Sequence, residues 1–236
     1  MEFTTAGDSL ALQYAAQTLK EMGWVQHKDA KTVLLPIPSL ESDGSMKGGG
    51  SIADIPEDRL IIGGNLDSLN RSSVIDLLKN PLYLSENAAI TAHCAIREAM
   101  TRLPVTLKDC NILVIGWGRI GKCLVRLLRL LGANVTVAAR KESDRALIFA
   151  LGYSAIDPAA EMDLSKYRVI YNTADAMVLP KERQCNCRVD CLKIDLASRK
   201  GIEGDDVVWA RGLPNKYAPE SSGKLIAEII VKELQG

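Results

Sequence analysis

The chain has 236 residues, 47% of them hydrophobic and 25% charged, and its formal net charge is zero. This is ordinary for a globular protein of one large domain or two small ones. No basic stretch is long enough to predict nucleic-acid binding, no apolar run reaches the length of a membrane span, and Met1–Thr5 lacks the features of a signal peptide. The six cysteines are scattered, which favours reduced thiols, so we expect a cytoplasmic protein with neither a nucleic-acid nor a membrane partner.

The first region alternates short apolar runs with an amphipathic helix, which predicts a smaller α/β domain of flavodoxin-like or Rossmann-like fold. Apolar side chains at helical spacing predict a helix at Leu10–Met22. Strands are predicted at Phe3–Gly7, Thr32–Ile37 and Arg59–Ile62. We place this domain, residues 1–86, on the substrate side.

Two loops of this domain are candidates for function. Ser42–Ser51 contains four glycines and is predicted to be a mobile loop. Its Lys47–Ser51 part lacks the Gly-Lys-Ser/Thr ending of a phosphate loop, so we favour the flexible loop. Asn65 ends a Gly-Gly-Asn turn at the carboxyl end of a strand, where open α/β sheets bind ligands. An ordinary turn is an equal interpretation, and Asn65 is a weaker candidate for substrate contact.

The next elements connect this domain to a second one. Arg71–Lys79 is predicted to be a short helix that Pro81 ends, and Leu82–Leu84 a short strand. A long helix then begins at residues 85–87 and supplies the linker at residues 87–104.

The sequence that follows has the spacing of a dinucleotide-binding turn. Ile112–Ile115 is an unbroken apolar run, typical of a buried strand, and Gly116, Gly118 and Gly121 follow as G-x-G-x-x-G before a helix. The first glycine permits a tight turn, the second lets backbone approach a pyrophosphate, and the third lets helix and strand pack closely. The predicted cofactor contacts in this turn are Gly116, Trp117, Gly118, Arg119, Ile120 and Gly121.

Further strands complete a doubly wound C-terminal Rossmann domain at residues 105–216, and they are expected at Val135–Ala138, Tyr153–Ile156, Arg168–Tyr171, Cys191–Leu196 and Val207–Ala210. Asn172 and Thr173 follow the fourth of the six strands and are predicted to touch ribose or nicotinamide. Residues 217–236 contain a last helix, at Ser221–Leu234, that is expected to pack back toward the N-terminal domain.

The end of the second strand bears on the choice of cofactor. An acidic residue usually stands there, about 20 residues past the glycines, when the cofactor has no 2′-phosphate. This chain has Arg140 and Lys141 instead, and a guanidinium binds a phosphate in bidentate fashion. The sequence therefore predicts NADP. A solvated basic pair with NAD as the cofactor is the alternative.

A metal site is the other chemistry to consider. Cys185, Cys187 and Cys191 form C-x-C-x3-C, but structural zinc takes four ligands and no fourth cysteine or histidine is near in the sequence. We therefore predict no metal.

Taken together, the motifs resemble the A subunit of dipicolinate synthase. The resemblance covers nearly the whole chain, and the Asp-Leu-Ala-Ser and Gly-Leu-Pro stretches are more specific than the glycines. The matching stretches are Leu107–Arg140, Tyr171–Thr173, Ile194–Arg199, Gly212–Pro214, Ala218-Pro219 and Gly223–Ala227.

The resemblance implies two α/β domains with a cleft between them, related in plan to the 2-hydroxyacid dehydrogenases. It implies NADP-linked oxidation of a dihydrodipicolinate-type ring to dipicolinate, a small dicarboxylate, in sporulating cells and together with the B subunit of dipicolinate synthase. We also expect a homo-oligomer. The alternatives are another dehydrogenase of a small carboxylate, and a nucleotide-binding subunit of a complex that does not catalyse.

Several residues depart from the family pattern where the cleft is expected. His93 stands where relatives typically have glutamate, and Ala174-Asp175 replaces Ile-Pro. Asp-Leu-Ala-Ser is followed by Arg199-Lys200-Gly201-Ile202, without the usual Pro-Gly-Gly, and Asn215 replaces a glycine.

His93 and three residues close to the other positions are the remaining candidate site residues. His93 is the candidate base because imidazole is a common general base, with a helix-surface or hydrogen-bonded core histidine as the alternative. Ser198 and Arg199 follow a strand end, and a guanidinium there could hold a substrate carboxylate. Lys216 is a weaker substrate candidate.

Overall fold

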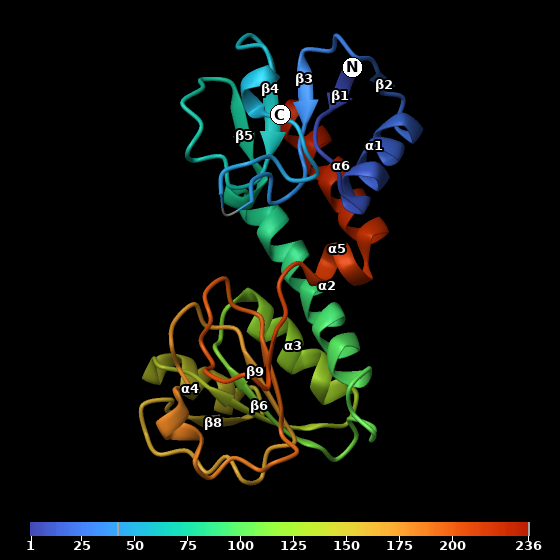
Figure 1. Cartoon of the computed structure of the whole chain (residues 1–236). Helices are drawn as coiled ribbons and strands as arrows, with labels where there is room; N and C mark the ends of the chain where they lie inside the picture. The colour runs from blue at the N-terminus through green and yellow to red at the C-terminus, as the bar shows by residue number, and fades with distance from the viewer. Residues whose placement is uncertain (42, 236) are drawn as a thin grey trace. The chain divides into compact units, whose positions relative to one another are not determined.

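The computed structural model describes residues 1–41 and 43–235. The chain forms two compact units (Figure 1): the first contains Met1–Ile90 and the segment from Pro214 onward, and the second contains Thr91–Leu213. Each unit has one parallel sheet, so the predicted fold class of two α/β units is confirmed. Gly236, the last residue of the predicted C-terminal segment, lies outside the described residues.

The first unit is built on a five-stranded sheet of order β2-β1-β3-β4-β5, in which all pairs are parallel. This is the flavodoxin-like order. The inner strand β4 is an unbroken apolar run, as expected of a strand covered on both faces, and its Ile61 and Ile62 are almost fully buried. The strands are β1 Glu2–Thr5, β2 Val25–Gln26, β3 Thr32–Leu34, β4 Leu60–Gly63 and β5 Val74–Asp76.

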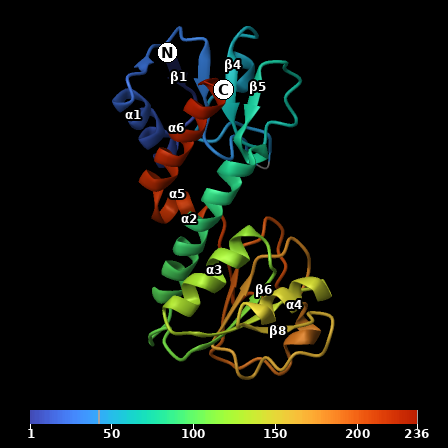
Figure 2. The same cartoon turned by 180° about the vertical axis from the view of Figure 1, so that it is seen from behind.

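Two helices of this unit, α1 (Leu10–Glu21) and α6 (Pro219–Gln235), lie side by side (Figures 1 and 2). Ser9 caps α1 by accepting the Leu12 N–H at 3.1 Å. The helices approach closely at Gly223, where a β-carbon would stand 2.4 Å from the Tyr14 β-carbon. The shorter helices are the 3-10 turns η1 Ile52–Asp54 and η2 Leu77–Lys79, and α5 Leu213–Tyr217, which spans the boundary in sequence between the units.

The predicted helix at Arg71–Lys79 is wrong. The segment forms the edge strand β5, which pairs with β4, and then the turn η2. Val74 and Ile75 are β-branched and fit a pleated edge better than a helix. Asp76 then starts η2 by accepting the Leu78 N–H at 2.9 Å.

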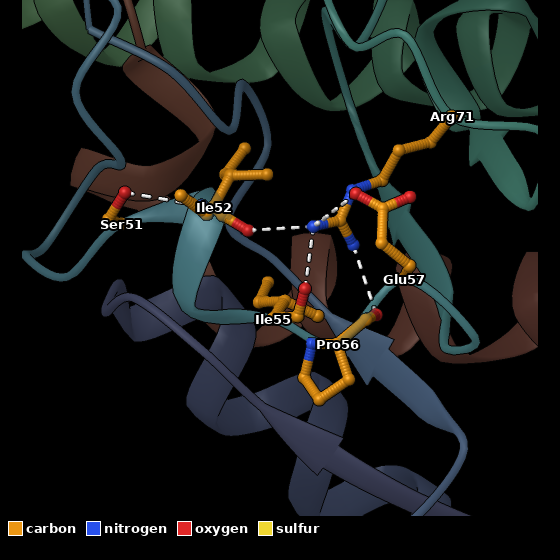
Figure 3. Close-up of polar contacts among 7 residues, drawn as sticks. Ser51, Ile52, Ile55, Pro56, Glu57 and Arg71 are labelled. Atoms are coloured by element: carbon orange, nitrogen blue, oxygen red, sulfur yellow. Dashed lines mark hydrogen bonds and ion pairs between the residues drawn. The ribbon is translucent and has the colours of Figure 1, made fainter.

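The side chain of Arg71, which precedes β5, bonds to the backbone of a segment that precedes β4 (Figure 3). Its guanidinium donates to the carbonyls of Ile52, Ile55 and Pro56 at 3.1, 2.6 and 3.2 Å. Its Nη2 lies 3.8 Å from Glu57 Oε1, and the arginine side chain is only 9% exposed. A single buried side chain therefore holds the segment that follows the glycine-rich loop.

That glycine-rich loop, predicted at Ser42–Ser51, begins at a residue outside the described ranges. Its later part is anchored to the turn after β1, because the Asp8 N–H donates to the Lys47 carbonyl at 3.1 Å. A β-carbon on Gly48 would stand 2.1 Å from the Asp8 nitrogen. Only glycine permits this approach.

The predicted strand at Leu82–Leu84 is also wrong, because helix α2 runs from Pro81 to Met100 and begins before the linker predicted at residues 87–104. Asn80 caps this helix by accepting the Tyr83 N–H at 2.9 Å. Pro81 is therefore the first helical residue, a position that suits its fixed φ and missing N–H, and it does not mark the end of a preceding element.

The second unit contains a six-stranded sheet of order β11-β10-β9-β6-β7-β8, again parallel throughout. This is the doubly wound order predicted for the C-terminal domain, and it reverses direction between β6 and β9. Helices α3 (Arg119–Leu130) and α4 (Glu142–Ala150) lie in front of β6 and β8 in Figure 2. The strands are β6 Asn111–Ile115, β7 Asn134–Ala138, β8 Ser154–Ile156, β9 Val169–Asn172, β10 Leu192–Asp195 and β11 Val207–Trp209, and the 3-10 turn η3 is Lys181–Gln184.

No helix in the described part of the chain has both the length and the apolar character needed to cross a membrane.

Candidate functional site

The glycine turn joins the end of β6 to the start of α3, at the point where the sheet reverses direction. Gly116 has φ +107°, which L side chains rarely adopt. A β-carbon on Gly121 would stand 2.3 Å from the Gly116 carbonyl oxygen. Gly118 differs from both, because a β-carbon there would meet no described atom within 4 Å. The first and third glycines are needed for packing, and the second faces open space.

This open space suits a dinucleotide pyrophosphate. Gly118 is also the N-cap of α3 and has no side chain with which to cap the helix. The first amides and the positive end of the helix dipole are therefore directed at the same open space. The residues present fit the phosphates of a dinucleotide, with the backbone of Gly118, Arg119 and Ile120 as the holding groups.

Thr173 supports the turn from the neighbouring strand. Its backbone N–H and its hydroxyl both donate to the Ile115 carbonyl, at 2.8 and 3.1 Å. The same hydroxyl lies against Gly116. Thr173 therefore joins the carboxyl ends of β6 and β9 directly beside the glycine turn.

Asn172 faces inward, although the sequence predicted contact with ribose or nicotinamide. It is fully buried, and its Nδ2 donates to Asp195 Oδ1 at 2.9 Å and to the Ala174 carbonyl at 3.0 Å. Its Oδ1 accepts the Ala174 N–H at 3.0 Å. These bonds use both the amide nitrogen and the amide oxygen of Asn172. Its side chain therefore holds the loop after β9 in place.

Asp195 completes this buried network, and no role of its own was predicted for it from the sequence. Its carboxylate is fully buried and accepts the backbone N–H groups of Ala197, Gly201 and Ile202 at 3.1, 2.6 and 3.0 Å, besides the Asn172 amide. Four donors compensate the buried charge. The signal in the sequence was an aspartate at the carboxyl end of a predicted strand.

The side chains of Arg140 and Lys141 are exposed where β7 ends. Arg145, in the first turns of α4, bonds to the backbone at the same strand end. Arg145 was not predicted from the sequence, because nothing local distinguishes it from other arginines on a helix surface.

Trp117 stands between the first two glycines and is half-buried. The ammonium of Lys122, on α3, lies 5.8 Å from the centroid of its ring, within the range of a cation–π contact. The indole Nε1 atom is buried and has no hydrogen-bond partner among the described residues. The contact with Lys122 fixes the ring beside the glycine turn.

The segment after β10 carries the predicted substrate residues Ser198 and Arg199, both exposed. The Arg199 N–H donates to Asp175 Oδ1 at 3.0 Å. The Lys200 ammonium lies 5.3 Å from the centroid of the Trp209 ring. Two residues that depart from the family pattern, Asp175 and Lys200, thus help to shape this segment.

A second cation, besides Lys200, lies over the Trp209 ring. The Trp209 indole Nε1 donates to the Ala197 carbonyl at 3.1 Å, and the Arg211 guanidinium carbon lies 5.3 Å from the ring centroid. Lys200 and Arg211 therefore bring two cations to the Trp209 ring, and Arg199 adjoins Lys200 in the sequence. An anionic substrate would be attracted to this surface.

The other predicted residues are divided between the two units. His93 is an exposed residue of α2 in the second unit, whereas Asn65 and Lys216 belong to the first. Asn65 has φ +62° and donates its N–H to Asp76 Oδ1 at 3.2 Å. The Lys216 ammonium lies 4.5 Å from the Tyr217 ring centroid.

Asn215, next to Lys216, has a structural contact. Its side-chain oxygen accepts the Ala11 N–H at 3.2 Å, in the first turn of α1. Asn215 therefore helps to cap α1.

The six cysteines are all free. Burial, together with the nearby Cys187, raises the pKa of Cys191 to about 12. In the described part of the chain, no group of three or more histidine, cysteine, aspartate or glutamate side chains is arranged to hold a metal ion.

The A subunit of dipicolinate synthase from Bacillus subtilis (strain 168) is 26% identical to this chain over 182 residues, which cover 72% of this chain and 60% of the relative. The crystal structure of the A subunit of dipicolinate synthase from Bacillus halodurans has a TM-score of 0.84 at 22% identity, covering 100% of this chain and 98% of that one. Salmonella D-lactate dehydrogenase has a TM-score of 0.64 at 12% identity, covering 100% and 98%. No protein-family model matches the chain.

The resemblance to the A subunit of dipicolinate synthase that the motifs predicted is therefore confirmed in sequence and in fold. The chain spans 60% of the length of the curated relative that it matches. The likeness to D-lactate dehydrogenase confirms the predicted relation in architecture to dehydrogenases of 2-hydroxyacids.

Proposed function

We propose that the chain is an NADP-linked oxidoreductase of the same type as the A subunit of dipicolinate synthase, which oxidises a dihydrodipicolinate-type ring. The observation that carries the proposal is the contrast among the glycines. A β-carbon on Gly116 or Gly121 would collide with neighbouring atoms, whereas Gly118, at the start of a helix, faces open space. A structural turn alone would have no need for that opening. A bound nicotinamide dinucleotide would supply the hydride acceptor.

The chain's own residues divide the binding of this cofactor between them. The backbone of Gly118, Arg119 and Ile120 holds the pyrophosphate, and Trp117 flanks it. Arg140 and Lys141 bind the 2′-phosphate, which is the reason to prefer NADP over NAD. Thr173 and the buried pair Asn172–Asp195 fix the loop that faces the ribose and the nicotinamide.

The substrate half of the proposal concerns charge and proton transfer. A dihydrodipicolinate ring carries two carboxylates and must lose a proton as well as a hydride to become aromatic. Ser198 and Arg199 hold one carboxylate, and the neighbouring cations Lys200 and Arg211 attract the dianion. His93 accepts the ring proton, and Asn65 and Lys216 are further candidates for substrate contact. Aromatisation supplies driving force, so the protein's main task is to position the ring.

A non-catalytic nucleotide-binding subunit is the second candidate. The observation that favours it is Asp175, whose carboxylate accepts the Arg199 N–H at 3.0 Å. A negative charge at that point weakens the attraction of Arg199 for a substrate carboxylate. In this case the chain would bind NADP and a partner resembling the B subunit of dipicolinate synthase without turning over substrate.

Absorbance of the reduced nicotinamide separates the two candidates. The purified chain is mixed with the B subunit of dipicolinate synthase, NADP and a freshly generated dihydrodipicolinate precursor. The leading proposal predicts NADPH formation that depends on the chain and is lost in His93→Ala. Measurable NADP binding with no NADPH formation would support the non-catalytic role. Failure to bind either NADP or NAD would overturn both. Light scattering of the purified chain alone tests the expected homo-oligomer.

A further inference from the structure

We propose that Arg145 is a positioning residue for cofactor choice: it fixes the backbone that carries Arg140 and so sets the preference for a dinucleotide with a 2′-phosphate. This rests on the proposed function, in which Arg140 binds that phosphate. Arg145 belongs to α4, and its side chain is only 24% exposed. It is therefore held by the protein and is not a freely mobile surface cation.

The contacts of Arg145 lie on both sides of Arg140. Its Nη1 donates to the Ala139 carbonyl at 2.8 Å and to the Arg140 carbonyl at 2.7 Å. These two carbonyls flank the α-carbon of Arg140. The Ala139 N–H also donates to the Ile156 carbonyl of β8 at 3.1 Å. The peptide planes around Arg140 are thus fixed, and with them the direction in which its side chain leaves the backbone.

A third contact ties this arrangement to the neighbouring strand. Arg145 Nη1 lies 3.2 Å from Asp157 Oδ2, and Asp157 directly follows β8. Asp157 is itself held, because its Oδ1 accepts the Ala159 N–H at 2.9 Å. One guanidinium therefore joins the carboxyl ends of β7 and β8, where the adenosine end of a dinucleotide binds in this fold.

Net charge alone does not account for a phosphate preference at this strand end. Residues 140–145 contain three basic and two acidic side chains, and Asp157 supplies a third acid. With the charges balanced, recognition depends on which cation faces the phosphate and in what orientation. A bidentate guanidinium–phosphate pair is sensitive to orientation, so the support given by Arg145 should affect affinity.

The test measures two affinities for each variant by nucleotide fluorescence, one for NADPH and one for NADH. Arg145→Lys keeps the charge, but its ammonium ends a shorter side chain and cannot take the position from which Nη1 reaches both carbonyls. It should lower the NADPH-to-NADH affinity ratio about fivefold, because a charge-assisted bond network is lost, while NADH binding changes less than about twofold. Arg145→Gln, which keeps a side-chain N–H donor, is the second variant. Arg126→Lys, at an exposed site of α3, is the control and should leave the ratio unchanged.

A double-variant cycle distinguishes positioning from a general structural role. In an Arg140→Leu background, Arg145→Lys should have no further effect on the ratio, because its action runs through Arg140. Equal losses for both nucleotides, or the same drop in the ratio without Arg140, would overturn the inference and leave the proposed function intact. A wild-type chain that prefers NADH, or an unchanged ratio in Arg140→Leu, would overturn the proposed NADP function itself.

Discussion

The hydroxyl oxygen of Thr173 lies 2.4 Å from the point that a β-carbon on Gly116 would occupy. The two residues belong to different strand ends, and the hydroxyl is held there by its bond to the Ile115 carbonyl. The first glycine of the turn is therefore required by a side chain from a distant part of the sequence as well as by its own φ of +107°. The glycine turn and the loop after β9 form a single packed arrangement.

Gly116→Ala should destabilise the second unit and abolish dinucleotide binding. An alanine in this positive-φ backbone conformation is strained by roughly 1–3 kcal/mol. Its methyl group would also collide with the Thr173 hydroxyl, so Thr173 would have to move. A denaturant titration would show the loss as a lower midpoint. Native stability in this variant would contradict the account of the turn.

Gly118→Ala should lower stability by no more than about 1 kcal/mol, because the added methyl group enters open space and only the poorer N-capping by alanine counts against it. Dinucleotide affinity should nevertheless fall at least about tenfold, since that space is assigned to the pyrophosphate. Fluorescence titration with NADPH measures the loss. An alanine at this position that binds NADPH as well as glycine does would remove the main support for a dinucleotide site.

Asp195→Asn should be strongly destabilising although it preserves the shape of the side chain. The new amide would place donor hydrogens opposite at least one of the N–H groups that now bond to the carboxylate. A buried donor without an acceptor costs about 1–3 kcal/mol. Asp163→Asn is the matched control, because an exposed asparagine can still accept the Ser165 N–H. Similar unfolding midpoints for the two variants would show that the buried network contributes little.

Local sequence signals predicted the parts of the site that depend on residues close together in the chain. The glycine spacing, the apolar strand and the missing acid at Arg140 are read within a single strand–helix–strand segment. Asp195 and Arg145 could not be assigned in the same way, because their partners are set by the packing of separate strand ends. Pro81 was misinterpreted for a different reason: proline both ends elements and starts helices, and the Asn80 cap decided between the two.

Arg71→Lys should loosen the segment that follows the glycine-rich loop of the first unit. A lysine ammonium cannot reach the three carbonyls that the guanidinium now binds (Figure 3). We expect a stability loss of about 1–3 kcal/mol and faster amide hydrogen exchange in residues 51–57. Arg59→Lys, which alters a single exposed contact to the Lys28 carbonyl, is the control. Equal exchange in the two variants would contradict the role of Arg71.

Cys191 should resist alkylation at pH 8.5 in the native protein. Burial is the main cause that raises its pKa to about 12, so the reactive thiolate is scarce at this pH. Because the folded pKa exceeds the unfolded value, the folded state holds the proton more tightly, and stability should fall as the pH rises from about 9 toward 12. Peptide mapping after iodoacetamide treatment should find the exposed Cys185 labelled and Cys191 unlabelled until denaturant is added. Early labelling of Cys191 would contradict its burial.

Arg140→Asp tests the cofactor assignment most directly, because it installs the acid that a cofactor without a 2′-phosphate usually meets at this position. A carboxylate repels the 2′-phosphate, whereas it can accept a hydrogen bond from a ribose 2′-hydroxyl. NADPH affinity should therefore fall by about two orders of magnitude, equivalent to roughly 3 kcal/mol, and NADH affinity should hold or rise. Lys141→Asp, one residue along on the same exposed turn, is the comparison and should have a smaller effect on the ratio. If NADPH and NADH affinity fell equally in Arg140→Asp, Arg140 would not bind the 2′-phosphate. NAD would then become the better cofactor assignment.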